Sequence, residues 1–161
     1  MLCYHTETEY KLYAADGVPM AQMRLSYPVY EGEGSEKQNA AEEKFCAGVR
    51  ALTERFSARA EEEYQANADP RKRFRFRPYV VTLSLSPGFA DEGLLSLGRL
   101  LTVTRRAKCL CRLFMGDTFL RKNGIRLPLS FFTDGKTRRS LGAKKADEYY
   151  LTETGDVCLR P

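Results

Sequence analysis

The sequence predicts a single α+β domain, in which an antiparallel β-sheet carries one long amphipathic helix packed on one face. One segment of about thirty residues repeats apolar side chains every three or four positions, a period typical of a helix. The segments on both sides of it alternate between apolar and polar residues, as strands do. Apolar residues make up 43% of the chain and charged residues 29%, which is typical of globular proteins. The length of 161 residues fits one domain over residues 1–161.

The first expected element is a β-hairpin. Residues 6–15 and 19–30 are extended stretches on either side of Asp16-Gly17. An Asp-Gly pair between two such stretches indicates a tight turn, because glycine accepts the positive φ that the turn requires.

The long helix follows the hairpin. Ser35 and Gln38 have the spacing of a capping box, so the helix is predicted to begin at about Glu36. The turn residues between Asn67 and Pro70 are predicted to end it. Charged side chains such as Glu42 are expected to face water. The stripe expected to pack on the sheet consists of Ala41, Phe45, Val49, Leu52, Phe56, Ala60 and Tyr64.

More strands are expected in the second half of the chain, as an antiparallel meander. From residue 71 the apolar residues alternate with arginines, and the alternation slips at Pro78, which predicts a bulge in a strand that lies at an edge or bends away from the sheet. Residues 133–145 are expected to form a loop or a short helix. Further strands are predicted at 94–104, 107–120 and 125–129, with turns at 86–88, 105–106 and 123–124, and a last hairpin at 148–152 and 156–159.

Cysteine content and hydropathy limit the class of protein. No apolar run is long enough to cross a membrane, and the first residues lack the pattern of a signal peptide, so the chain as given is expected to be cytoplasmic. Cys109 and Cys111 would share one face of a strand, as a metal or redox pair could, but we interpret them as buried apolar side chains. All cysteines are predicted to be free thiols: Cys3, Cys46, Cys109, Cys111 and Cys158.

Patterns that carry catalysis are missing from the sequence. The one histidine, His5, lies in a terminus that is expected to be mobile, and no G-x-S-x-G motif or phosphate-binding glycine loop occurs. The carboxylate pairs Asp91-Glu92 and Asp147-Glu148 are expected to be solvated loop charges. The sequence therefore predicts a protein that is not an enzyme, with no catalytic residue, no metal ligand and no cofactor.

A basic segment gives an alternative function. The net charge is +5, and residues 70–161 hold 19 Lys or Arg against 8 Asp or Glu. Strand alternation would place Arg73, Arg75 and Arg77 on one face, where guanidinium groups can bind the phosphates of nucleic acid or another polyanion. The same arginines could instead form a solvated edge that opposes aggregation, and we favour this second interpretation.

Four segments, in this order, match the pattern of a known family. They are residues 25–30 before a helix that contains Asn39, then residues 94–97, 122–132 and 148–157. Together they resemble the bacterial domain of unknown function found at the C-terminal side of RsiV-type, lysozyme-binding anti-sigma factors and in the non-catalytic part of PdaC-type peptidoglycan deacetylases. Residues 105–108 depart from the Gly-Gly-Ala-His stretch that the family often has.

The resemblance implies a binding or sensing domain, and members of that family usually lie outside the membrane. It transfers neither lysozyme recognition nor any site residue. We therefore expect a non-catalytic domain that binds a protein or a cell-envelope component. Binding of a nucleic acid or other polyanion is the alternative, and a small hydrolase is the third possibility.

Overall fold

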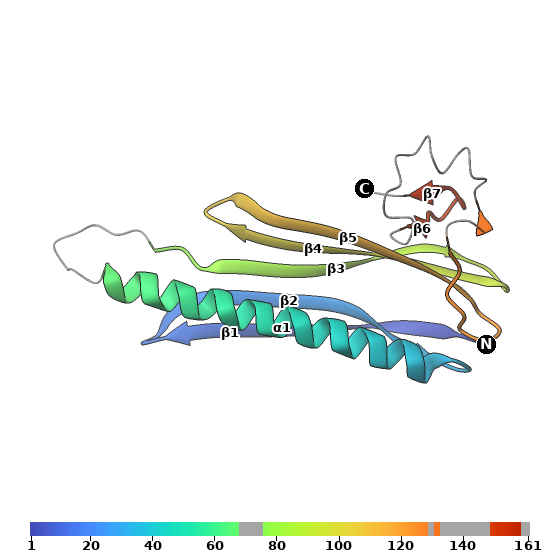
Figure 1. Ribbon diagram of the computed structural model, residues 1–161, viewed down its shortest axis with the longest axis horizontal. Coiled ribbons are helices and arrows are strands. Elements are labelled where there is room, and N and C mark those ends of the chain that lie inside the picture. The colour runs from blue at the N-terminus through green and yellow to red at the C-terminus, as the bar shows by residue number, and fades with distance from the viewer. Residues whose placement is uncertain (68–75, 129–130, 133–148, 159–161) are drawn as a thin grey trace.

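The computed structural model describes residues 1–67, 76–128, 131–132 and 149–158. Strands β1 to β5 form one sheet in chain order, and β6 pairs with β7 in a small second sheet. Figure 1 shows the long helix lying along one face of the larger sheet, so the predicted α+β fold class is confirmed. The elements are β1 (Cys3–Ala15), β2 (Val18–Glu31), α1 (Ser35–Ala66), β3 (Tyr79–Ala90), β4 (Leu94–Arg105), β5 (Lys108–Leu120), β6 (Tyr150–Leu151) and β7 (Val157–Cys158).

The larger sheet is antiparallel except where β2 meets β3. Residues 21–25 of β2 pair in parallel with residues 79–83 of β3. A parallel neighbour cannot be reached through a hairpin, so the chain must first return along the sheet, and α1 provides that return. The 14 residues of β2 and the 32 of α1 both span roughly 46–48 Å. The predicted antiparallel meander is therefore correct for the pairing of β3 with β4 and of β4 with β5. It is wrong for the pairing of β2 with β3, which is parallel.

Helix α1 begins on a glycine rather than on a side-chain cap. Gly34 has a φ of 82° and no side-chain hydrogen bond caps the helix, so the predicted capping box is wrong. A Cβ at Gly34 would lie 2.4 Å from the carbonyl oxygen of Asn123, so no larger residue fits there. Gln38 donates from Nε2 to the carbonyl oxygen of Gly124 instead, at 2.9 Å. These contacts attach the start of the helix to the loop after β5.

The helix packs on the sheet as predicted, but through a stripe rotated from the predicted one. Phe45, Leu52 and Phe56 are only partly buried and pack at the flank of the core. The prediction that Glu42 faces water is wrong, because the guanidinium group of Arg99 on β4 pairs with its carboxylate. The most buried helix residues are Glu42, Cys46, Val49, Thr53 and Ala60.

The turns differ in part from those predicted. The hairpin turn at Asp16-Gly17 is confirmed, whereas the one between β4 and β5 uses Arg106 and Ala107, both at positive φ. Residues 86–88 are not a turn, because a bulge between Pro87 and Ala90 accommodates the proline inside β3. The chain turns at Asp91 instead. Asp91 Oδ1 accepts hydrogen bonds from the backbone N–H groups of Gly93 and Leu94. The strand predicted at 125–129 is only a single bridge from Arg126 to Phe119.

The last hairpin, confirmed as β6 and β7, packs on the face of the sheet opposite α1. Ser96 of β4 accepts a hydrogen bond from the Leu151 N–H at 2.7 Å. A Cβ at Gly116 of β5 would lie 2.2 Å from the carbonyl oxygen of Tyr149. Since neighbouring residues of a strand face opposite sides, Arg99 and Asp117 point toward the helix side. The loop or short helix predicted at 133–145 lies outside the described residues.

Two buried clusters hold the larger sheet and the helix together. The first lies under α1 and includes Met23, Leu25, Cys46 and Val81, all 2% exposed or less. The second lies at the other end of the sheet, around Tyr30, Leu97 and Phe119. In the part of the chain that the structure describes, no helix is both long and apolar enough to cross a membrane.

Candidate functional site

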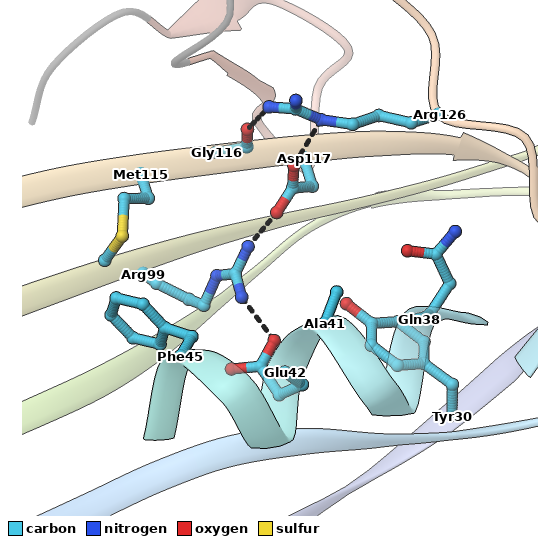
Figure 2. A pocket seen from close by; sticks show the side chains of 10 residues that line it. All are labelled: Tyr30, Gln38, Ala41, Glu42, Phe45, Arg99, Met115, Gly116, Asp117 and Arg126. Carbon is cyan, nitrogen blue, oxygen red and sulfur yellow. Dashed lines mark hydrogen bonds and ion pairs between the residues drawn. The ribbon is translucent and has the colours of Figure 1, made fainter. Parts of the chain in front are cut away.

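A cavity of about 410 Å³ separates the N-terminal half of α1 from strands β4 and β5. It lies where α1, which packs mainly against β2, stands away from strands β4 and β5. Figure 2 shows the lining side chains converging from the helix below and the strands above. They are Tyr30, Gln38, Ala41, Glu42, Phe45, Arg99, Met115, Gly116, Asp117 and Arg126.

A chain of alternating charges runs along the wall of this cavity. Arg99 donates from one terminal nitrogen to Glu42 Oε2 and from the other to Asp117 Oδ2. Arg126 continues the chain, with its Nε 2.5 Å from Asp117 Oδ1. The side chains of Glu42, Arg99 and Asp117 are 5%, 11% and 12% exposed, and that of Arg126 is 47% exposed at the rim. Carboxylates and guanidinium groups are equal in number, so the wall carries no net charge. We call these residues the charge chain.

Strand register brings the charge chain together. Leu97 of β4 pairs with Asp117 of β5, and Arg99 pairs with Met115, so the two charged residues lie diagonally on one face. Neither residue was predicted from the sequence as part of a site. The available signal was a charge inside an apolar strand, at a position whose same-face neighbours are apolar. Glu42 was missed because it was assigned to the solvent face of the helix.

Burial perturbs the acidic groups of the cavity. It raises the pKa of the Glu42 carboxyl above its usual range, and the charge of Arg99 opposes this shift. It also raises the pKa of the Tyr30 hydroxyl well above the usual value for a tyrosine. The Tyr30 hydroxyl therefore keeps its proton. Glu42 Oε1 and Arg99 Nε are buried and have no hydrogen-bond partner among the described residues. No described protein group uses this acceptor and this donor, and both are enclosed, so a ligand in the cavity reaches them only if neighbouring side chains move.

A second, apolar groove continues from the cavity along the helix. Its volume is about 420 Å³, and it shares Ala41 and Phe45 with the cavity. It lies between α1 and Leu101 of β4. The other residues that line it are Lys44, Gly48, Val49 and Leu52.

The basic segment lies elsewhere. Arg73 and Arg75 are outside the described residues, and Arg77 is exposed just before β3. The carbonyl oxygen of Arg77 accepts a hydrogen bond from Arg105 Nε at 3.0 Å. The strand predicted from residue 71 begins only at Tyr79, since residues 76–78 are not paired in the sheet. The polyanion hypothesis for the three arginines stays a prediction.

The two neighbouring cysteines are not a buried pair. A bulge in β5 pairs Cys109 with Thr104 and Cys111 with Val103, so the cysteines lie on opposite faces of the strand. Both are exposed, which makes their interpretation as buried side chains on one face wrong. Cys3 and Cys46 are also free thiols. No group of three or more potential metal ligands occurs among the residues that the structure describes.

His5 does not lie in a loose terminus. It belongs to β1, where its Nδ1 lies 2.9 Å from Glu31 Oε1. Of the carboxylate pairs singled out from the sequence, Asp91-Glu92 lies in the turn between β3 and β4, as expected, and Asp147-Glu148 is outside the described residues.

The fold and the cavity together define a class of α+β domain: a mostly antiparallel sheet, one long helix and a charge-lined cavity between them. No protein-family model and no curated protein matches the chain. Among solved structures the chain is similar to the crystal structure of a DUF3298 family protein from Pseudomonas aeruginosa PAO1, with 10% sequence identity and a TM-score of 0.44. The similarity covers 88% of this chain but 61% of that one. DUF3298 is the RsiV- and PdaC-like domain, the family that the sequence segments resemble.

Proposed function

We propose that this chain is a non-catalytic binding domain and that its ligand, a protein or a cell-envelope component, occupies the cavity beside the charge chain. The cavity of about 410 Å³, whose wall holds two carboxylates and two guanidinium groups, carries this proposal. A buried polar atom without a hydrogen-bond partner destabilises a protein by about 1–3 kcal/mol. A ligand that displaces the neighbouring side chains and pairs with Glu42 Oε1 and Arg99 Nε would recover that energy.

The contacts of the carboxylates support binding rather than catalysis. Both oxygens of Asp117 already accept from guanidinium groups, so neither is free to exchange a proton with a substrate. General acid–base catalysis needs a carboxyl that can exchange a proton with its substrate. Glu42 has the raised pKa of such a group, but Arg99 is bound to its other oxygen and opposes protonation. The charge chain is therefore built to hold its shape and to offer hydrogen bonds at its edge.

The proposal can be tested by titrating the ¹⁵N-labelled protein with soluble envelope fragments: an N-acetylglucosamine oligosaccharide, a peptidoglycan stem peptide and methyl glucoside. We expect at least one fragment to shift amide resonances of α1 and of β4 and β5 around the cavity. Glu42→Gln should weaken that binding roughly tenfold, the equivalent of one hydrogen bond to a charged group. The exposed Glu36 in the first turn of α1 provides the matched control, Glu36→Gln, which should bind as the wild type does.

Shifts confined to residues away from the cavity, or equal binding by Glu42→Gln, would contradict this site. Turnover of any fragment that is lost in Glu42→Gln would show instead that the cavity is an active site.

A further inference from the structure

The polar cavity and the apolar groove form one elongated depression, because Ala41 and Phe45 line both. The charged side chains lie at one end of it, and apolar side chains with one exposed lysine line the other. Their volumes, about 410 and 420 Å³, each lie in the usual range of small-molecule sites. A ligand that fits both parts needs a polar head and an apolar tail.

We propose that the ligand of this site is a single-chain amphiphile with an uncharged, hydroxyl-bearing head, the head in the cavity of the charge chain and the chain along the groove. This inference rests on the proposed function and names the chemical class of its ligand.

The charged groups of the wall select the head. A hydroxyl group both donates and accepts, so hydroxyls can pair with the carboxylates as well as with the guanidinium groups that line the cavity. The Tyr30 side chain lines the same cavity, and its hydroxyl can join these bonds. Because the carboxylates and guanidinium groups of the wall balance, a charged head gains no net attraction there while it loses hydration.

The helix surface over the groove selects the tail. Ala41, Phe45, Gly48 and Leu52 form one stripe of α1, beside the buried stripe, and Leu101 of β4 lies opposite. A Cβ added at Gly48 would meet no atom within 4 Å, so the space beside it is open. Glycine inside a helix is less stable than alanine by about 1 kcal/mol, and nothing in the packing of α1 requires it here. The groove therefore stays open at a position where a larger residue would fit and would favour the helix.

The test is a chain-length series of n-alkyl β-glucosides, from methyl to nonyl, each kept below its micelle concentration and titrated into the full chain. We expect amide shifts at the cavity for every member. The dissociation constant should fall by up to about fourfold for each methylene placed in the groove, as expected for the burial of one methylene. Glu42→Gln should weaken every member by the same factor.

Gly48→Leu blocks the groove without leaving a cavity, and its higher helix propensity should keep the melting temperature at or above that of the wild type. In this variant, methyl glucoside should still bind while the gain with chain length disappears. Ala47→Leu is the matched control, because Ala47 is exposed on α1 and lines neither the cavity nor the groove. It should retain the full chain-length series.

The outcomes separate this inference from the proposed function. Equal affinity for all chain lengths, or an unchanged series in Gly48→Leu, would overturn the amphiphile and leave the cavity as a binding site. Tighter binding of decanoate than of octyl glucoside, lost in Lys44→Ala, would overturn the uncharged head. If no glucoside, oligosaccharide or stem peptide shifts residues of the cavity, the proposed function itself fails.

Discussion

Replacement of Arg99 tests how the charge chain joins the helix to the sheet. Arg99→Met keeps an apolar stem of similar length but leaves the Glu42 carboxylate, 5% exposed, without a counterion. Asp117 keeps its contact with Arg126, so only one carboxylate is stranded. Removing one partner from a buried pair costs about 3–5 kcal/mol, which is a large share of the 5–15 kcal/mol that holds a typical domain folded. We expect Arg99→Met to fold and to lose about 3–5 kcal/mol.

The double variant Glu42→Leu/Arg99→Met removes the stranded carboxylate as well. Well-packed apolar replacements of a buried ion pair are often close to neutral, so the double variant should be more stable than Arg99→Met by about 2 kcal/mol or more. The control is Arg50→Met, which removes ion pairs to Glu9 of β1 and to Glu43 on the other flank of α1. Because the side chains of Arg50, Glu9 and Glu43 are 26%, 29% and 66% exposed, their loss should cost about 1 kcal/mol or less.

The measurement is urea unfolding monitored by far-ultraviolet circular dichroism. The free energies of unfolding are compared between variants whose dependence on urea concentration has the same slope. A loss below 1 kcal/mol in Arg99→Met would refute the reasoning. So would a double variant whose loss equals the sum of the losses in Arg99→Met and in the single variant Glu42→Leu, since the two residues would then act independently.

The remaining predictions concern thiols and packing. In the native protein a thiol reagent should label the exposed Cys3, Cys109 and Cys111 but not Cys46, and denaturation without reductant should expose five thiols, so a lower total would reveal a bridge. Burial raises the pKa of the Cys46 thiol from its usual 9.0 to about 12. As the pH rises, the thiol of the unfolded chain therefore ionises before that of the folded chain. The contribution of Cys46 to the free energy of unfolding should be fully present below pH 9.0 and should fall by up to about 1.4 kcal/mol per pH unit between that pH and about 12. Cys46→Val should flatten this fall in urea titrations, and an unchanged pH dependence would assign it to other groups such as Tyr30. Gly116→Ala should undock the β6–β7 hairpin, because its Cβ would meet Tyr149 backbone at 2.2 Å, whereas Gly48→Ala should stabilise the protein by about 1 kcal/mol. Loss of the Leu151 amide protection in hydrogen exchange is the readout, and full protection in Gly116→Ala would contradict the packing described.

Local patterns in the sequence determine most of the elements. The helix is set by its 3.6-residue period and the first hairpin by Asp16-Gly17, and both depend on residues close together in the chain. The alternation of Tyr79, Val81 and Leu83 likewise identifies β3 and its buried face. The fold class follows from these elements, because an amphipathic helix and half-apolar strands must bury their apolar sides against each other.

The tertiary structure decides how the elements meet, and with it the candidate site. The parallel pairing of β2 with β3 depends on the length of α1 relative to the sheet, which no local pattern states. Glu42 is a solvent-facing residue by its polarity, and it becomes a buried one because Arg99, 57 positions later, lies opposite it. The cavity arises from the position of α1 over β2 rather than over β4 and β5. A charge in an apolar strand signals that a partner is needed, but only the packed sheet and helix determine which residue it is.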